Sequence, residues 1–398
     1  GLRNLTIISD ALDNVKMNRG IEIDLENLEV DDKESYRLLA RGDTLGVFQL
    51  DGTAMRSLLR LMGPTCFDDI VAVLALYRPG PMANIPTYCA RKHGDEESEY
   101  LHPMLEPILK ETFGVIIYQE QVMQIAQVMA GYSLGGADLL RRAMGKKIAE
   151  EMAKERPKFV DGSKAQGVDE KKAGEVFDLL EKFANYGFNK SHAAAYAVVS
   201  YQTAWLKANH PVEFMAAVMN CDIHLTDKLA VYRREVDRMG IEVIPPSVNL
   251  SQPTFSVSEG RIVYALGALK NVGVEAMRTL VAARGDRPFR DLTDFARRVP
   301  LRQVGKRALE MLARAGAFDE LDANRARVLK SLDTLVAWSA AVQDAARSSQ
   351  SSLFGGGEDL RAIVVAVDAQ RPPVRGGDVE EVHVRARVRG AQHPVHVD

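Results

Sequence analysis

The sequence contains little cysteine and no long apolar run. Its three cysteines, Cys66, Cys89 and Cys221, are far apart and odd in number, which argues against a disulfide framework and a cysteine-rich zinc site. No apolar segment approaches the roughly 20 residues that span a bilayer, and no signal peptide opens the chain. We therefore expect a cytoplasmic protein with no membrane partner and no metal site within this chain.

The chain also lacks an excess of positive charge. Its 51 Lys and Arg against 54 Asp and Glu give a net charge of −3, so contacts with nucleic acid must come from local basic patches. Hydrophobic residues make up 46% of the 398 residues, which is ample for two or three buried domains. Because residue 1 is Gly rather than Met, we take the chain to be a fragment.

Residues 1–220 carry apolar side chains at helical spacing. One such stripe consists of Val122, Ile125, Ala126 and Met129. The segment 78–81, Arg-Pro-Gly-Pro, interrupts the pattern because two prolines and a glycine cannot continue a helix. The spacing predicts helices over 118–132 and 191–209.

A short stretch after residue 240 has a different pattern. Pro245 and Pro246 interrupt regular structure, and residues 254–257 and 261–264 then flank Ser-Glu-Gly, which predicts a short β hairpin. The predicted fold class is therefore mainly α and multidomain, with a helical domain followed by this hairpin and a second helical domain.

An internal repeat follows the hairpin. Residues 269–277 align with residues 301–309, and each copy places a glycine directly before a helix. The glycine allows close approach of the backbone, and the N–H groups that open the helix suit a phosphate oxygen. The residues expected to contact DNA here are Lys270, Gly273, Arg302 and Gly305. An ordinary pair of helical hairpins with glycine turns is the alternative.

A dense basic cluster follows an apolar helical run, around residue 140. Four cations occupy seven residues: Arg141, Arg142, Lys146 and Lys147. Arg142 and Lys146 are four residues apart, so on a helix they share a face and can hold the β- and γ-phosphates of a nucleoside triphosphate. Arg141 and Lys147 flank that face, toward the α-phosphate or a nucleic-acid strand. The alternative is a solvated basic face that pairs with Asp138 and Glu150.

A second patch combines aromatic rings with hydrogen-bond donors. Its candidate nucleotide-binding residues are Tyr186, Phe188, Asn189, Lys190 and His192. The two aromatic rings are candidates to stack on the base, and the other three offer donors to sugar or phosphate. Against this, one of the two rings is expected to belong to the core.

Two further cations lie beside turns. Arg78 belongs to the segment 78–81, and Lys92 to the segment 91–94, Arg-Lys-His-Gly. Both are candidates to contact DNA phosphates, and a turn-forming surface is an equally good account.

Five motifs occur in order along the chain: Phe48-Gln49-Leu50, Tyr77-Arg78-Pro79-Gly80-Pro81, Tyr118-Gln119-Glu120-Gln121, Leu140-Arg141-Arg142-Ala143-Met144-Gly145-Lys146-Lys147 and Tyr186-Gly187-Phe188-Asn189-Lys190-Ser191-His192. Together they closely resemble the alpha subunit of bacterial DNA polymerase III, the C-family replicative polymerase, from residue 1 to about 357. The resemblance implies 1–20 as the end of the palm, 21–224 as the fingers, 225–345 as a tandem helix-hairpin-helix region, 346–357 as a clamp-binding peptide and 358–398 as a divergent tail. The family's hairpin often has a second glycine, where Val274 and Lys306 stand here.

The resemblance also implies a function and its partners. The parent would be a DNA-directed DNA polymerase that binds dNTP, primer–template DNA and other holoenzyme subunits, with Mg²⁺ held by three palm carboxylates. Those carboxylates are expected upstream of Gly1, so the fragment alone is predicted to be inactive, and its first twenty residues to lack their packing partner. The acidic pairs 31–32 and 68–69 are expected to be helix surface or caps.

A short motif near the end resembles the peptide by which the family binds the sliding clamp. Its residues are Gln350, Leu353 and Phe354, in a stretch rich in serine and glycine. Two apolar anchors would enter a pocket while the glutamine bonds the rim. The clamp motif favours the replicative form over the error-prone paralogue of the family. A stand-alone helix-hairpin-helix module is the other alternative, and the basic cluster disfavours it.

The last stretch differs in composition from the rest of the chain. Residues 361–398 contain ten Val and six Arg but no Leu, Lys, Ser, Thr or aromatic residue. We interpret this tail as an out-of-frame translation. Its three histidines, His383, His393 and His396, lack acidic or cysteine partners at metal spacing.

Overall fold

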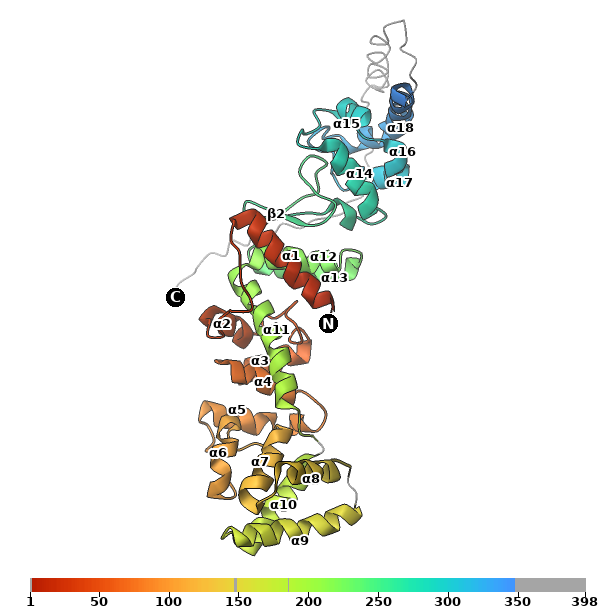
Figure 1. The fold of residues 1–398 in the computed structure, drawn as a ribbon. Coiled ribbons are helices and arrows are strands. Elements are labelled where there is room, and N and C mark those ends of the chain that lie inside the picture. Colours follow the sequence, from red (N-terminus) through yellow and green to blue (C-terminus); the bar gives the residue numbers. More distant parts are fainter. Residues whose placement is uncertain (1, 147–148, 185, 348–398) are drawn as a thin grey trace, which may run out of the picture. The chain divides into compact units, whose positions relative to one another are not determined.

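The computed structural model describes residues 2–146, 149–184 and 186–347 (Figure 1). These residues are mostly helical with one small sheet, which confirms the predicted fold class. The chain divides into two compact units, residues 1–343 and 344–398, and nearly all of the second lies outside the described residues. Among the helices described, none is long and apolar enough to cross a membrane.

The first hydrophobic core is built around a long helix, α11 (Lys190–Asn209), which packs against α2 and α4 (Figure 1). The other elements of this core are α2 (Lys33–Arg41), α3 (Thr53–Met62), α4 (Phe67–Leu76), η1 (Pro81–Asn84) and α5 (Ile85–His93). Leu39, Leu59 and Ile70 are fully buried in it. As predicted, the helix before the proline turn ends, at Leu76.

Acidic residues cap two of these helices. Asp32 is the N-cap of α2 and accepts a hydrogen bond from the backbone N–H of Ser35 at 2.8 Å. Asp69, in the first turn of α4, accepts from the N–H groups of Thr65 and Cys66. The cap role predicted for these two carboxylates is therefore confirmed, and Asp69 is buried rather than solvated.

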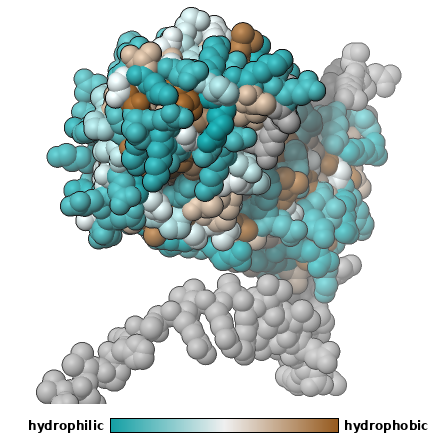
Figure 2. All heavy atoms as spheres, turned by 90° about the horizontal axis from the view of Figure 1, so that it is seen from below, coloured by the Kyte–Doolittle hydropathy of each residue, from teal (hydrophilic) through white to brown (hydrophobic). Residues whose placement is uncertain are grey.

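A second core joins the segments between residues 103 and 184. Its elements are η2 (Pro103–Leu105), α6 (Glu106–Leu109), η3 (Lys110–Thr112), α7 (Gln119–Ala130), α8 (Leu134–Lys146), α9 (Ala149–Ala165) and α10 (Glu170–Ala184). The predicted stripe on α7 is buried along its whole length. Seen from the side of α9 and α10, hydrophilic side chains dominate the surface, with apolar ones between them (Figure 2).

The third core contains the opening helix, α1 (Leu2–Arg19), together with α12 (Pro211–Cys221) and α13 (Thr226–Arg238). Ile7 and Ala11 of α1 are buried there, and Arg19 pairs with Glu213 of α12 at 2.7 Å. The expectation that the first twenty residues lack a packing partner was wrong, because α12 of this chain packs against α1.

The small sheet adds one strand to the predicted hairpin. β2 (Ser256–Ser258) pairs antiparallel with β3 (Arg261–Val263) through a turn at Glu259 and Gly260, both with positive φ, which confirms the hairpin. β1 (Val243–Ile244) pairs parallel with β3 and gives the order β1-β3-β2. β1 was not predicted from the sequence, because two residues before two prolines carry no strand pattern.

The repeat is reproduced in three dimensions. Its region consists of η4 (Leu266–Ala268), α14 (Val274–Arg284), α15 (Leu292–Arg298), α16 (Leu301–Val304), α17 (Lys306–Arg314) and α18 (Arg325–Arg347). Gly273 and Gly305 are the N-cap residues of α14 and α17, as predicted. Leu280 and Leu312, which stand three residues after the two aligned segments, are both fully buried.

Candidate functional site

A pocket of about 430 Å³ lies where three of the five motifs meet. Its lining comes from residues 49–55, 74–78 and 188–196, which are far apart in the sequence. The polar and aromatic lining residues drawn from the motifs or next to them are Gln49, Asp51, Tyr77, Arg78, Phe188 and His192. The fold therefore brings residues of these three motifs together around one pocket.

The third motif joins this place through the backbone. The N–H of Phe188 donates to the carbonyl of Ile117 at 3.0 Å, and the N–H of Gln119 donates to the carbonyl of Phe188 at 2.9 Å. A Cβ added at Gly187 would lie 3.1 Å from the Cα of Gln119, so a residue without a side chain suits this close approach. Segments 117–119 and 187–188 are thereby fixed against each other.

Arg78 ties the proline turn to the last motif. Its guanidinium lies 4.3 Å from the centre of the Phe188 ring and donates to the carbonyl of Tyr186 at 2.7 Å. Burial lowers the pKa of Arg78. Gly80 has a φ of +101°, and an added Cβ would lie 2.3 Å from the Tyr186 ring, so this turn requires glycine. The Arg78 guanidinium thus has protein partners on two sides.

Asn189 and Lys190 shape the start of α11. The Asn189 side chain caps the helix by accepting from the N–H of His192 at 2.7 Å, and its amide donates to Glu120 at 3.1 Å. The Lys190 ammonium donates to Glu111 at 2.6 Å. His192, by contrast, is exposed.

Aromatic rings form a row along one side of the pocket. Phe188 and His192 have ring centres 5.6 Å apart, His192 and Tyr196 4.5 Å, and Tyr196 and Phe48 5.4 Å. Tyr196 was not predicted from the sequence, although it lies four residues after His192 on the same face of α11. Phe188 packs partly against the first core, whereas Tyr186 is exposed. One ring of the pair therefore belongs to the core, as expected.

The basic cluster lies on α8. Asp138 pairs with both Arg141 and Arg142 at 2.8 Å, so the Asp138 contact of the alternative interpretation is present. Arg141 also donates to Gln119 at 3.1 Å, and its side chain is 23% exposed against 62% for Arg142. Lys146, at the end of α8, is exposed. Lys147 lies outside the described residues.

The contact between Arg141 and Gln119 connects the fourth motif to the others. Gln119 bonds Phe188 through its backbone and Arg141 through its side chain. Glu120, the next residue, accepts from the Asn189 amide and the Lys190 N–H. All five motifs are therefore linked by direct contacts or by the shared pocket.

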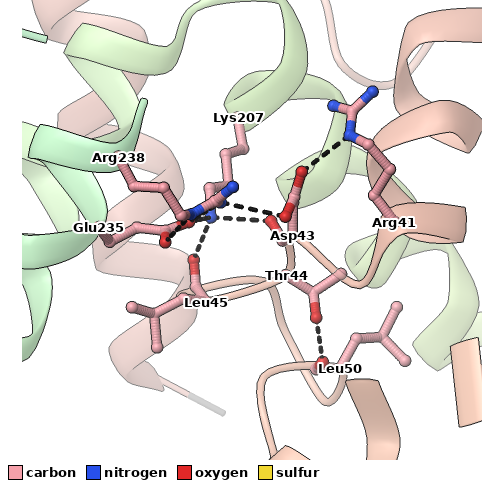
Figure 3. Close-up of polar contacts among 8 residues, drawn as sticks. All are labelled: Arg41, Asp43, Thr44, Leu45, Leu50, Lys207, Glu235 and Arg238. Carbon is pink, nitrogen blue, oxygen red and sulfur yellow. Dashed lines mark hydrogen bonds and ion pairs between the residues drawn. The ribbon is translucent and has the colours of Figure 1, made fainter. Parts of the chain in front are cut away.

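A buried charge cluster holds the loop that carries the first motif (Figure 3). The ammonium of Lys207 on α11 donates to the carbonyls of Asp43 and Leu45 at 2.8 and 3.0 Å and to Glu235 at 2.7 Å. Arg238 contacts Glu235 and the Asp43 carboxylate at 2.9 and 3.1 Å. The Lys207 side chain is 0% exposed, and burial lowers its pKa although Glu235 opposes this.

The pKa of Glu235 moves in the direction that favours its charged form. Burial acts to raise this pKa, but the hydrogen bond from Arg238 and the charge of Lys207 outweigh it and lower the pKa to about 2. Glu235 is therefore ionised at neutral pH, and the cluster is a charged network linking α11, α13 and the loop that contains Asp43 and Leu45 (Figure 3).

Lys92 makes polar contacts with two side chains of the first core. Its ammonium is 3.2 Å from both the Asp69 carboxylate and the Thr65 hydroxyl, and its side chain is 10% exposed. Its contact with DNA stays a prediction.

The repeat presents its cations to solvent. Lys270 and Arg302 are exposed, one before each glycine turn. The helices that follow, α14 and α17, have 11 and nine residues. The pattern predicted from the sequence, a cation and a glycine before a helix, is thus present twice.

The described residues contain no group of three or more His, Cys, Asp or Glu side chains that could hold a metal ion. Neither the clamp-motif residues Gln350, Leu353 and Phe354 nor the tail histidines belong to the described residues.

Comparison with known proteins decides the family. Residues 4–167 match the bacterial DNA polymerase III alpha subunit finger domain, and residues 240–328 match the helix-hairpin-helix motif. DNA polymerase III alpha subunits from Caulobacter vibrioides (strain NA1000 / CB15N) and Thermus aquaticus are 54% and 50% identical over 356 and 360 residues, 89% of this chain in each case. The chain belongs to the bacterial DNA polymerase III alpha subunit family.

The match to this family covers most of the chain but only part of its relatives. The alpha subunit of Haemophilus influenzae (strain ATCC 51907 / DSM 11121 / KW20 / Rd) is 49% identical over 387 residues, 94% of this chain. The chain spans about a third of these relatives, 29–33% of their length. The finger match begins within α1. The domain boundaries given above stay predictions.

Proposed function

We propose that this finger and helix-hairpin-helix segment binds incoming dNTP and primer–template DNA for a DNA-directed DNA polymerase. The observation that carries the proposal is the position of Arg142 and Lys146. Both are exposed, four residues apart on α8, and the neighbouring Arg141 is anchored to Gln119 and through it to the pocket motifs. An exposed pair of cations on a rigid helix suits a triphosphate.

Within this proposal, phosphate oxygens replace Asp138 as partners of Arg142. Ion pairs between exposed side chains add little stability, so exchanging this carboxylate for a more highly charged phosphate costs little. The guanidinium offers two parallel donors, and Lys146 adds a compact charge one turn further along. Arg141 keeps its contact with Gln119 and orients the helix. Lys147 is proposed to meet the α-phosphate or the template strand.

The segment 186–192 handles base and sugar in the proposal. Tyr186 and Phe188 supply rings for stacking, and the exposed His192 supplies a donor. Asn189 and Lys190 support the loop through Glu120 and Glu111.

The proposed reaction uses Mg²⁺, but the described residues do not provide its binding site. Mg²⁺ prefers carboxylate oxygens and phosphates, and when bound it neutralises the phosphates and activates the attacking oxygen. We expect its carboxylates upstream of Gly1. The contribution of this chain is to bind and orient the nucleotide.

The repeat is proposed to hold duplex DNA by its backbone. Lys270 and Arg302 contact phosphates together with the backbone N–H groups that open α14 and α17 at Gly273 and Gly305. Such contacts position a duplex without reading its sequence. Arg78 and Lys92 are proposed as further contacts to the template or primer, although both cations already have protein partners.

Residues 346–357 are proposed to bind the sliding clamp. Leu353 and Phe354 enter an apolar pocket and Gln350 bonds its rim. A peptide of these residues should bind clamp at about micromolar Kd, since two buried apolar side chains supply roughly 1.5–3 kcal/mol each before the cost of ordering. Replacing both by alanine should abolish binding, and undiminished binding would refute the assignment. Other holoenzyme subunits are expected partners of the same parent.

The nucleotide assignment is tested by Arg142→Ala in a complete polymerase that carries this segment. The KM for dNTP should rise about tenfold or more, as expected when a charge-assisted hydrogen bond worth roughly 1.5–3 kcal/mol is removed. The Kd for primer–template DNA should stay unchanged. Arg156→Ala, an exposed arginine of α9 paired with Asp178, is the matched control. A dNTP KM equal in the two variants would refute the assignment.

A further inference from the structure

A second pocket, of about 490 Å³, is lined by residues of both the first and the second core. Its described lining comes from α5, α6 and α10 and from the segments 99–101 and 114–116, with a few residues between these elements. No described residue assigned above to dNTP or DNA belongs to it. Small-molecule sites in proteins typically measure roughly 300–1,000 Å³, so this pocket has room for a ligand of its own.

Most of the lining of the second pocket is apolar. Leu105, Leu109 and Ile116 are no more than 4% exposed. Tyr100 and Phe183 are partly buried against the second core and add aromatic faces. An apolar group that enters removes this surface from water, which is the main driving force for binding in such pockets. The body of the ligand is therefore apolar.

Two cations lie in the same lining. Arg91 uses Nε for Glu96 and Nη1 for the Phe113 carbonyl, and its third nitrogen has no hydrogen-bond partner among the described residues. Lys172 pairs with Glu175 at 2.8 Å. The side chains of Glu96 and Glu175 are 46% and 37% exposed, so a ligand carboxylate can replace either of them at little cost.

The balance of charge sets the charge of the ligand. Glu99 is the one carboxylate among the described lining residues, so the two cations leave an excess of a single positive charge. That excess matches a monoanion, whereas a phosphate monoester, with a charge of about −1.5 to −2, exceeds it. An apolar body with one negative charge is an amphipathic monocarboxylate.

The backbone around Arg91 is held in place before any ligand arrives. Phe113 has a φ of +53°, a left-handed conformation that is costly for a residue with a side chain, and Arg91 donates to its carbonyl at 3.1 Å. Gly114 follows with a φ of +81°, and a Cβ added there would lie 2.6 Å from the carbonyl oxygen of Glu99. The turn therefore requires glycine, and it keeps the guanidinium next to the lining.

The lining of the second pocket continues into the segments that pair beside the first pocket. The carbonyl of Phe183 accepts from the N–H groups of Tyr186 and Gly187 at 2.9 and 3.0 Å. Ile116 directly precedes the segment 117–119, which is hydrogen-bonded to the same loop. A ligand that contacts Phe183 and Ile116 thus touches the supports of both paired segments.

We propose that the second pocket binds an amphipathic monocarboxylate. Its apolar body lies against Leu105, Ile116 and Phe183, and its carboxylate pairs with Arg91 and Lys172. Occupancy holds the supports of segments 117–119 and 187–188 and so stabilises their pairing. This site does not depend on the proposed contacts with dNTP or DNA, because it uses none of their described residues.

The test uses the full 398-residue chain and the fluorescent monoanion 1-anilinonaphthalene-8-sulfonate, displaced by decanoate below the concentration at which micelles form. Decanoate should displace the dye about fivefold more effectively than 1-decanol, which has the same chain length and no charge. Lys172→Glu should weaken decanoate binding about fivefold or more. Lys171→Glu, an exposed neighbour outside the lining, is the charge-matched control and should bind as the parent chain does. Equal displacement by the acid and the alcohol, or equal affinity of the two variants, would overturn the proposal.

A second variant tests whether the ligand enters this pocket. Thr87 of α5 is half-buried in the lining, so Thr87→Phe should fill the space and abolish displaceable dye binding. Thr279→Phe, at a half-buried threonine of α14, is the control and should leave dye binding unchanged. Displaceable binding that survives in Thr87→Phe would mean that the ligand sits elsewhere, and the proposal would fail.

Hydrogen exchange in the parent chain tests the link to the paired segments. Decanoate at ten times its Kd should slow amide exchange at Gln119 and Phe188 about tenfold, provided that their opening destroys the pocket. Exchange at Ile262, whose N–H donates to the Glu242 carbonyl in the sheet region, should stay unchanged. Bound decanoate without slower exchange at Gln119 and Phe188 would refute the stabilisation of the pairing.

Discussion

The guanidinium of Arg78 lies 4.3 Å from the ring centre of Phe188 and joins two motifs that are more than a hundred residues apart. The same side chain donates to the carbonyl of Tyr186. One residue thus combines a cation–π contact with a charge-assisted hydrogen bond, and it bridges the two loops that shape the pocket.

Replacing Arg78 should therefore loosen the last motif. We expect Arg78→Ala to lose roughly 1–3 kcal/mol of local stability, and Arg78→Lys to lose part of it because an ammonium lacks the planar fork. Amide hydrogen exchange at Phe188 and Gln119, whose N–H groups bond across the two segments, should accelerate. Arg37→Ala, an exposed arginine paired with Glu34, should leave both rates unchanged. Equal exchange in Arg78→Ala and the parent chain would contradict the bridging role.

Breaking the buried cluster at Lys207 should have a larger effect. Lys207→Met removes three hydrogen bonds and leaves Glu235 with Arg238 as its remaining partner in the cluster, so we expect a loss of about 3–5 kcal/mol. Urea unfolding followed by Trp205 fluorescence, in a common Trp338→Phe background, reports on α11 directly. Arg41→Ala removes an exposed partner of Asp43 and should change stability by less than about 1 kcal/mol. Similar values for the two variants would refute the stabilising role of Lys207.

The depressed pKa of Glu235 predicts acid sensitivity of the same region. With a folded pKa of about 2 and an ordinary value of 4.5, the unfolded chain binds a proton on acidification before the folded chain does. The stabilisation is complete above about pH 4.5, falls as the pH drops toward 2 and is lost below that. Glu235→Gln should flatten this slope, whereas Glu275→Gln, at an exposed position, should not. An unaltered slope in Glu235→Gln would show that other groups control acid unfolding.

The repeat should give a salt-dependent signature of backbone binding. Lys270→Ala combined with Arg302→Ala should weaken duplex binding equally for all sequences. It should also reduce the slope of log K against log salt by about 2, since each phosphate that a cation neutralises adds roughly 0.9 to that slope. Lys164→Ala, an exposed lysine of α9, is the control. A slope unchanged by the double variant would leave the two turns as ordinary helical hairpins.

Sequence pattern was sufficient for the features that depend on local spacing. The stripe from Val122 to Met129, the end of α4 before Pro79, the turn at Gly260 and the glycine N-caps of the repeat each follow from the chemistry of a few adjacent residues. The five motifs also predicted the family, which the comparisons confirm.

Features that depend on contacts between residues far apart in the sequence could not be predicted from local spacing. Lys207 is an ordinary lysine in the sequence, and its burial follows only from the positions of Asp43, Leu45 and Glu235 in space. β1 exists because β3, almost twenty residues later, lies beside it. The packing of α1 on α12 joins residues about two hundred positions apart. Periodicity predicts which face is buried, but not which helix covers it.

The central claim, that Arg142 and Lys146 of α8 hold the triphosphate of an incoming dNTP, is tested most directly by photo-crosslinking in a complete polymerase that carries this segment. The probe is a dATP bearing an azidoanilide on its γ-phosphate, added with primer–template DNA and mapped by mass spectrometry. We predict labelling of the peptide that contains residues 134–147, and its loss in the Arg142→Ala and Lys146→Ala double variant. Labelling only elsewhere, or undiminished labelling in that variant, would contradict the account.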